Sequence, residues 1–417
     1  MADRDVEAII RRALDRLAGD LPALGIALSG GGDSVALMQI IARWADGRRI
    51  MAATVDHALR AGSDAEAEAA GAAAAALGIA HQILRWDRPP TSGDGGKPTG
   101  NLMAQARDAR LRLMAGWAQE NDLPAVALGH SRDDQAETVV MRLLRGSGVD
   151  GMAGMADWRD AFGVRWLRPM LGVGRDELRD WLTTKDIGWI DDPSNANPEF
   201  DRIRIRRTLS ELDVDRSALA MVAANLTEVR ATLAHYAAEV AHEAVADRGR
   251  LTLPRGPFRR APAEIQRRIL IAAARWVTGA DYPPRRATVL HALRALDAGS
   301  RVTLDGTIIS PDGDRLQITR EPAAALRAPR SAGPVWDNRW RVEGLEPGQL
   351  IGALGDEALA DLSWRLSGLP RDDAAASPAI RDAEGNLVAA PLIRAHPGIT
   401  CLPLRNTEEF RRLIRHG

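Results

Sequence analysis

The chain has 417 residues, of which 45% are hydrophobic and 27% are charged, and its formal net charge is −1. These values are typical of a soluble globular protein of roughly two or three domains, and the balanced charge means that any surface for a nucleic acid must be local. One cysteine, Cys401, excludes a disulfide framework or a cysteine metal cluster within one chain. No signal peptide or membrane-spanning run is recognisable, so we expect a cytoplasmic protein with no membrane partner.

The first elements form an anion-binding turn between a strand and a helix. Apolar residues at helical spacing from Val6 to Leu17 predict an amphipathic helix, and the apolar run Leu24–Leu28 predicts a buried strand. Helical spacing resumes at Val35, so the glycines between them lead into a helix N-terminus, where free N–H groups and the helix dipole attract anions. A purely structural turn is the alternative. The turn consists of Ser29, Gly30, Gly31, Gly32, Asp33 and Ser34.

A second strand, Ile50–Val55, ends at Asp56 and His57. In a doubly wound sheet, ligands bind at the carboxyl ends of strands, so Asp56 is placed to meet the ribose or base of a nucleotide. A surface turn is the alternative, because aspartate often follows a strand for that reason alone. An alanine-rich helix over about 63–77 and a strand over His81–Trp86 follow, and the composition of residues 88–100 predicts a mobile loop.

The next helix and strand bring further polar residues to the same sheet edge. A long helix runs from its capping residue Asn101 to about Gln119 and carries Arg107 and Arg110 on one face, which is usually a solvated arrangement. The strand Ala125–Leu128 then leads into a helix that ends in a glycine C-cap within 145–148.

We expect this second helix to present His130, Asp134 and Glu137 on one face at the carboxyl edge of the sheet. The two carboxylates can hold Mg²⁺ or an ammonium group of a substrate. Alternatively, they form an acidic first turn that stabilises the dipole of their own helix.

The first domain, residues 1–212, is predicted to be an α/β domain with a doubly wound parallel sheet, because strands alternate with helices throughout it. Its last elements are a strand at Val164–Leu167, a helix at Arg175–Lys185 and a turn-rich loop at Trp189–Asn195. The segment Asp201–Arg207 is too alternating and basic for a simple core helix.

The second half contains the local basic surface. Residues 213–247 predict a helical connector, whose helix covers 215–246, and residues 248–321 a mainly helical domain rich in arginine, including Arg259 and Arg260. This concentration favours a nucleic-acid interface, with a solvated helical face as the alternative. A hairpin is expected at Thr303–Thr319, an Ala/Pro linker at 322–334 and a small β-rich domain at 335–417.

Several motifs resemble known families. The turn at residues 29–34 resembles the pyrophosphate loop of the N-type ATP pyrophosphatases, which split ATP into AMP and pyrophosphate. Taken together with the other motifs, it resembles the tRNA(Ile)-lysidine synthetases, with the dense match covering about half of the chain. These motifs are, in order, Ser29–Ser34, Asp56-His57, Asn101, Arg107, Arg110, Gly129-His130, Asp134–Thr138, Arg145–Gly148, Arg168-Pro169, Asp192–Asn195, Arg202 and Arg206.

The resemblance implies a ligase that uses ATP and Mg²⁺ to join L-lysine to C2 of the wobble cytidine in the CAU anticodon of tRNA(Ile). It implies that the loop with Asp56 and His57 binds ATP, and that Asp33 also positions the metal. The remaining implied roles are lysine binding by Asp134 and Glu137, catalysis by Asp33, His130, Arg110 and Arg206, and tRNA binding by Arg202, Arg259 and Arg260.

Three positions depart from the residues usual in this family: Met103 replaces an acidic residue, Ser131 a second histidine and Leu111 an aromatic residue. Two other kinds of protein are alternatives to this ligase. Other enzymes with this loop, such as tRNA thiolases, need cysteines that the chain lacks near the loop. A non-catalytic nucleotide- or RNA-binding protein on the same fold would not require both Asp33 and Asp134.

Overall fold

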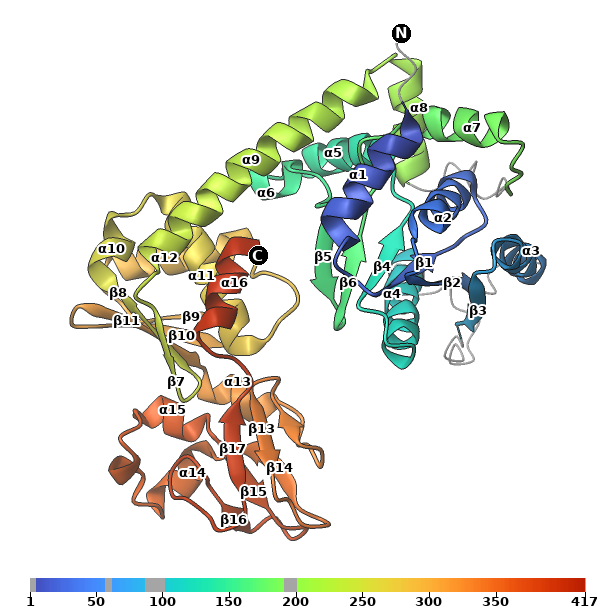
Figure 1. The fold of residues 1–417 in the computed structure, drawn as a ribbon. Helices are drawn as coiled ribbons and strands as arrows, with labels where there is room; N and C mark the ends of the chain where they lie inside the picture. Colours follow the sequence, from blue (N-terminus) through green and yellow to red (C-terminus); the bar gives the residue numbers. More distant parts are fainter. Residues whose placement is uncertain (1–4, 57–61, 87–101, 191–200, 417) are drawn as a thin grey trace, which may run out of the picture. The chain divides into compact units, whose positions relative to one another are not determined.

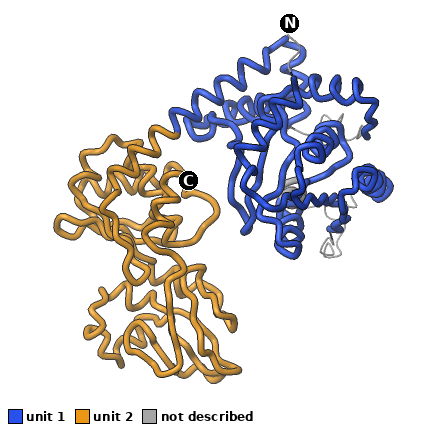
Figure 2. Tube along the Cα trace, viewed as in Figure 1, with its two compact units in different colours: residues 1–230 blue, residues 231–417 orange. Residues whose placement is uncertain are grey.

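The computed structural model describes residues 5–56, 62–86, 102–190 and 201–416 (Figure 1). The chain divides into two compact units, residues 1–230 and 231–417, which are coloured separately in Figure 2. Each unit buries hydrophobic cores of its own. Within the described residues, no helix has both the length and the apolar character needed to cross a membrane.

A six-stranded sheet with the order β3-β2-β1-β4-β6-β5 forms the centre of unit 1 (Figure 1). Strands β1, β2, β3, β4 and β6 are parallel, and the edge strand β5 is antiparallel to β6. The predicted doubly wound parallel sheet is therefore confirmed. The strands are β1 (Ala23–Ala27), β2 (Arg49–Asp56), β3 (Ala80–Arg85), β4 (Ala125–Leu128), β5 (Trp158–Ala161) and β6 (Val164–Leu167).

Helices cover both faces of this sheet, because successive strand residues point to opposite sides. In β4, Ala125 and Ala127 join a core with α1, α2, α3 and α7, whereas Val126 and Leu128 join a second core with α4. The helices of unit 1 are α1 (Val6–Ala18), α2 (Gly32–Trp44), α3 (Ser63–Ala75), α4 (Leu102–Glu120), α5 (Arg132–Leu144), α6 (Val149–Met152), α7 (Arg175–Thr184), α8 (Asp201–Glu211) and the start of α9 (Arg216–Val240).

The strand order fixes where a ligand can bind. Strand β1 lies between β2 and β4, so the connections that leave β1 and β4 diverge to opposite parts of the sheet. In open α/β sheets this divergence opens a crevice at the carboxyl ends of the strands. The expected anion-binding turn follows β1, and His130 follows β4, so both lie at this point.

Two elements of unit 1 were not expected. Strand β5 forms a tight hairpin with β6, whose turn residues Phe162 and Gly163 have φ angles of 54° and 74°. A two-residue turn of this kind is usually marked by Asn-Gly or Asp-Gly, whereas the turn here is Phe162-Gly163. The short α6 also escaped prediction. Residues 201–207, which the sequence indicated as too alternating and basic for a simple core helix, form the start of the helix α8.

The first part of unit 2 is a five-stranded sheet covered by helices. Of its five strands, the sequence predicted only the two that form the hairpin at 303–319, which are β10 and β11. Its strand order is β7-β8-β11-β10-β9. Helix α9 ends at Val240, six residues before the predicted end, because the chain turns there toward β7. The elements are β7 (Val245–Asp247), β8 (Arg250–Pro254), α10 (Arg255–Arg260), α11 (Ala263–Thr278), α12 (Arg286–Asp297), β9 (Val302–Leu304), β10 (Thr307–Asp312) and β11 (Arg315–Arg320).

The second part of unit 2 contains two three-stranded sheets, β12-β13-β17 and β14-β15-β16. The expected linker at 322–334 is wrong in its first half, where α13 forms and buries Ala325 completely. The elements are α13 (Pro322–Arg327), β12 (Val335–Trp336), β13 (Trp340–Glu343), β14 (Leu350–Ala353), α14 (Gly355–Ala360), the 3₁₀ helix η2 (Trp364–Ser367), α15 (Arg371–Ala375), β15 (Pro378–Arg381), β16 (Leu387–Ala389), β17 (Thr400–Pro403) and α16 (Thr407–His416).

Helix α16 leaves this second part and returns to the first. It packs against α11, and its Phe410 and Ile414 belong to the same buried core as α11, α12 and the five-stranded sheet (Figure 1). The expectation that 335–417 forms one β-rich domain therefore fails for its last helix, whose strongly amphipathic sequence fits a helix that covers a core.

Candidate active site

The turn after β1 has the geometry of an anion site. Helix α2 begins at Gly32, and its first N–H groups, from Gly32 to Ser34, have no partner inside the helix. Gly30 has a φ angle of +80°, which favours glycine. The Ser34 hydroxyl donates to the Gly31 carbonyl at 2.9 Å, accepts from the Ser29 N–H at 3.1 Å and lies 3.0 Å from the Ser29 hydroxyl. The two hydroxyl groups therefore stabilise the turn, and its backbone N–H groups remain available to bind an anion.

Neighbouring segments fit closely around this turn. The Ile190 N–H donates to the Gly30 carbonyl at 3.0 Å, which ties the segment after α7 to the turn. At the end of β4, a Cβ atom on Gly129 would lie 3.2 Å from the backbone nitrogen of Ser34. A side chain at position 129 would therefore push against the first turn of α2.

Asp56 lies at the end of β2, as expected, but it is buried and already engaged. Its Oδ1 accepts a hydrogen bond of 2.7 Å from the hydroxyl of Ser63, the first residue of α3. The contact fixes the start of the next helix, and the burial of Asp56 does not fit the alternative of a surface turn. Nucleotide binding by Asp56 stays a prediction. His57 lies outside the described residues.

His130 precedes α5 and is not part of it, which corrects the expectation that it shares a helix face with Asp134 and Glu137. Burial lowers the pKa of the imidazole to about 3, and the positive charges of Arg168, Arg202 and Arg110 act in the same direction. His130 is therefore neutral at pH 7. Its Nδ1 atom is buried and has no hydrogen-bond partner among the described residues.

Asp134 serves the helix and the site together. Its Oδ2 accepts hydrogen bonds from the Ser131 N–H at 2.8 Å and the Ser131 hydroxyl at 3.1 Å, which is a capping box. Its Oδ1 lies 3.1 Å from Arg175 and 3.2 Å from Arg202. The alternative that Asp134 stabilises the first turn of its own helix is therefore confirmed, with Ser131, which departs from the family pattern, as the cap, whereas its binding of a cation from a substrate stays a prediction.

Glu137 is the most buried acidic group of the site, with no solvent exposure. Its carboxylate accepts hydrogen bonds of 2.7 Å from Nε of Arg202 and of 2.7 Å from Nε of Arg206, and Nη1 of Arg175 lies 3.5 Å away. Arg202 and Arg206 are four residues apart on α8, so both point to one side of that helix. The basic segment at 201–207 therefore docks on α5 through Glu137.

Arg175 joins the two halves of the site, and the sequence analysis missed it. It is the first residue of α7, and its side chain is 16% exposed. Its Nε atom lies 3.2 Å from Oδ2 of Asp33, and its two Nη atoms reach Asp134 and Glu137. An arginine at the first position of a helix is unfavourable, because its positive charge lies at the positive end of the helix dipole. Such an arginine in a sequence therefore indicates that another element brings a carboxylate close to it.

The site is dense in charge. Asp133 accepts from the backbone N–H of Arg175 at 2.8 Å and lies 3.3 Å from Nε of Arg216. Burial raises the pKa of Asp33, while Arg175 opposes that shift. Four carboxylates, of Asp33, Asp133, Asp134 and Glu137, thus face the four guanidinium groups of Arg175, Arg202, Arg206 and Arg216.

The residues expected to bind tRNA divide between the units. Arg202 belongs to the site in unit 1, whereas Arg259 and Arg260 are exposed at the end of α10 in unit 2. Part of the arginine-rich stretch is structural, because Arg267 and Arg268 both pair with Glu264. The basic surface is therefore smaller than the arginine count suggests.

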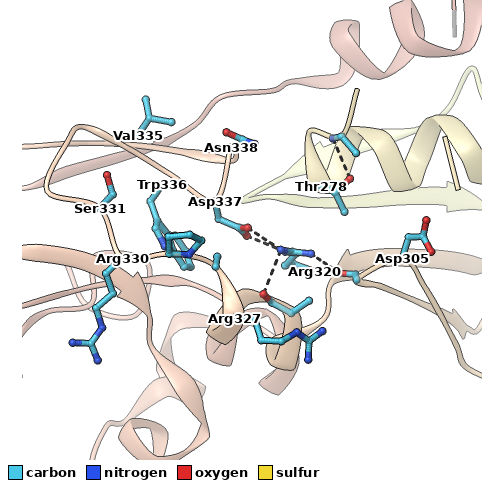
Figure 3. A pocket seen from close by; sticks show the side chains of 15 residues that line it. Thr278, Asp305, Arg320, Arg327, Arg330, Ser331, Val335, Trp336, Asp337 and Asn338 are labelled. Atoms are coloured by element: carbon cyan, nitrogen blue, oxygen red, sulfur yellow. Dashed lines mark hydrogen bonds and ion pairs between the residues drawn. The ribbon is translucent and has the colours of Figure 1, made fainter. Parts of the chain in front are cut away.

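Unit 2 also holds a cavity of about 810 Å³, formed by the end of α11, the β9/β10 turn and the segment after α13 (Figure 3). In its wall, Arg320 donates hydrogen bonds of 2.9 and 2.8 Å to the carboxylate of Asp337. Arg327, Arg330 and Trp336 also line it. This cavity was not predicted from the sequence.

Comparison with known proteins agrees with the fold and identifies the family. A family model described as a PP-loop domain matches residues 5–212, so unit 1 carries the nucleotide-binding domain of the PP-loop ATPases. The tRNA(Ile)-lysidine synthase of Ruegeria pomeroyi is 42% identical over 398 residues, which cover 93% of this chain and 92% of that protein. The chain belongs to the tRNA(Ile)-lysidine synthase family.

A second relative supports this assignment. The tRNA(Ile)-lysidine synthase of Bradyrhizobium diazoefficiens is 36% identical over 367 residues, which cover 79% of this chain and 99% of the relative. Among solved structures, the U34-tRNA thiolase NcsA from Methanococcus maripaludis is 18% identical with a TM-score of 0.47, and the match covers 54% of this chain and 78% of that one.

Proposed function

We propose that the chain ligates L-lysine to C2 of the wobble cytidine in the CAU anticodon of tRNA(Ile), with cleavage of ATP to AMP and pyrophosphate. The observation that carries this proposal is the direct contact between two sites. The loop carboxylate Asp33 and the carboxylates Asp134 and Glu137 are bridged by one arginine, so an activated base and an amine substrate can meet there.

In the first step, the cytosine O2 attacks the α-phosphorus of ATP and pyrophosphate leaves. The backbone N–H groups of residues 30–34 and the dipole of α2 are placed to stabilise the charge that grows on pyrophosphate. We assign ATP to this loop, with Arg110 and Arg206 near the nucleotide and the target base.

Asp33 is a suitable ligand for Mg²⁺ that arrives with ATP. Among the described residues, no group of three or more acidic, histidine or cysteine side chains can hold a metal by itself. Mg²⁺ is commonly held by one or two carboxylates together with substrate phosphates, and a single loop carboxylate fits that pattern. When bound, the ion would neutralise phosphate charge.

In the second step, the lysine amine attacks C2 of the adenylated cytidine, and AMP leaves with the former O2 atom. An amine of this kind has a pKa near ~10.4 in water and must lose a proton before it attacks. We assign the binding of the lysine ammonium groups to Asp134 and Glu137. We assign to the neutral His130 a hydrogen bond with the reacting groups, and its Nδ1 atom, which has no partner among the described residues, supports this assignment.

We also propose that the exposed arginines of unit 2 contact the body of the tRNA. Support comes from Arg259 and Arg260 on α10 and from Arg285 and Arg286 at the start of α12, all of which are exposed. Guanidinium groups bind phosphate well because their N–H donors match its oxygens. The same surface is our candidate for rejecting methionine tRNA, which shares the CAU anticodon.

The test is transfer of radiolabelled lysine to tRNA(Ile) bearing CAU, with ATP, for the wild type and Asp134→Asn. We expect label on the wobble base and a loss of at least about 100-fold in the variant, since a positioned charged group commonly contributes that much. Asp176→Asn, an exposed carboxylate one residue from Arg175, is the matched control and should keep its activity. Cleavage of ATP to AMP without lysine transfer would point to a different nucleophile.

A further inference from the structure

In the cluster around Arg175, four guanidinium groups match four carboxylates before any substrate arrives, and Arg110 and Arg168 add further positive charge beside His130. Each of the four carboxylates contacts at least one of the four guanidinium groups, and Glu137 contacts three of them. His130 adds no charge at pH 7. Free lysine carries two ammonium groups and one carboxylate, so its entry would leave an excess positive charge in a poorly hydrated place. Such a charge is unfavourable unless a guanidinium group leaves or an anion is added.

Arg175 is the guanidinium group with an alternative partner. Arg202 and Arg206 lie on α8 and contact the carboxylates of α5. Among the arginines of this cluster, Arg175 also contacts Asp33, the second residue of α2. The anion site formed by the start of α2 is therefore within one side-chain length of its guanidinium group, and bound phosphates would compete for it.

We propose that Arg175 couples the two substrate sites: it neutralises Asp134 and Glu137 in the empty protein and transfers to the phosphates of bound ATP. ATP then supplies the anion that the charge balance requires and frees carboxylate oxygens for the ammonium groups of lysine. Lysine consequently binds tightly only after ATP. This inference rests on the proposed function, because it assigns ATP to the loop and lysine to Asp134 and Glu137.

The coupling is measurable without turnover. In calorimetric titrations of the full chain with L-lysine, the α,β-methylene analogue of ATP, which cannot release pyrophosphate, should tighten lysine binding by about 10-fold or more, within the usual range of coupling between sites. By reciprocity, lysine should tighten binding of the analogue by the same factor. In Arg175→Gln, the affinity for lysine should be about equal with and without the analogue, because the variant has no guanidinium group that could move from the carboxylates to the phosphates.

Arg207→Gln is the matched control. Arg207 lies on α8 but pairs with the exposed Glu211 and does not belong to the cluster, so this variant leaves the charge of the cluster unchanged and should keep the wild-type ratio of the two lysine affinities. If Arg175→Gln does not fold, Arg175→Lys replaces it, since one ammonium group cannot span three carboxylates and should reduce the ratio.

The possible failures are distinct. Equal lysine affinity with and without the analogue in the wild type would overturn the coupling, and so would an unchanged ratio in the Arg175 variants. Failure of the wild type to bind the analogue or lysine under any of these conditions would instead contradict the proposed function.

Discussion

The buried carboxylate of Glu137 allows a quantitative prediction about α8. This helix buries Leu209 as its one fully buried apolar side chain within the described residues, and Arg202 and Arg206 attach it to Glu137. In Glu137→Gln, the side chain keeps its shape and one acceptor oxygen but loses its charge. Removal of one partner of a buried ion pair typically costs about 3–5 kcal/mol. Arg202 and Arg206 are 30% and 31% exposed, so water compensates part of this cost.

We therefore expect the docking of α8 to weaken by roughly 1.5–2.5 kcal/mol, which corresponds to about 10- to 70-fold faster amide exchange. Hydrogen exchange followed by mass spectrometry should show this in peptides covering 201–211, while α1 stays unchanged. Arg207→Gln is the control on the same helix, because its pair with Glu211 is exposed and should change exchange by less than about 2-fold. Equal protection of α8 in the wild type and Glu137→Gln would refute the argument that the ion pairs dock this helix.

Two further predictions concern His130 and the basic surface. The pKa of His130 is about 3 in the folded protein and about 6.5 when unfolded, so the unfolded chain binds the proton first as pH falls. Unit 1 should therefore lose about 2 kcal/mol of stability between pH 7 and pH 5, and urea unfolding of His130→Gln should lack this loss; an identical pH dependence would contradict it. Charge reversal of Arg259 and Arg260 should weaken tRNA binding and reduce the salt dependence by about two counterions, whereas reversal of the exposed Arg12 in unit 1 should change neither.

The nucleotide-binding half of the site could be predicted because its signals are local. An apolar run followed by glycines and a helical pattern defines a strand, a turn and a helix N-terminus within about 15 residues. Residues 29–34 therefore have the predicted geometry. The carboxylates of α5 were predicted for the same reason, and the expected alternative that they stabilise their own helix applies to Asp134, which forms a capping box with Ser131.

Other parts depend on contacts between distant residues. Arg175 reaches Asp33 across 142 positions of sequence, and no spacing rule links them. The segment of Arg202 and Arg206 is too basic for a simple core helix, and the sequence does not show that both charges are paired with the distant Glu137. The hairpin of β5 was missed because Phe162 occupies a left-handed turn position that Asn or Asp usually marks.

The return of α16 to α11 makes the second part of unit 2 an insertion within the first. The indole N–H of Trp276 donates to the carbonyl of Asn406 across 130 positions, so both ends of the insertion are held on one core. During synthesis, the core around α11 must wait for Phe410 and Ile414, since they fill space that no earlier residue covers. A nascent chain that ends at residue 320 therefore lacks the helix that covers α11, and the core of the first part is completed only after the whole second part has been synthesised.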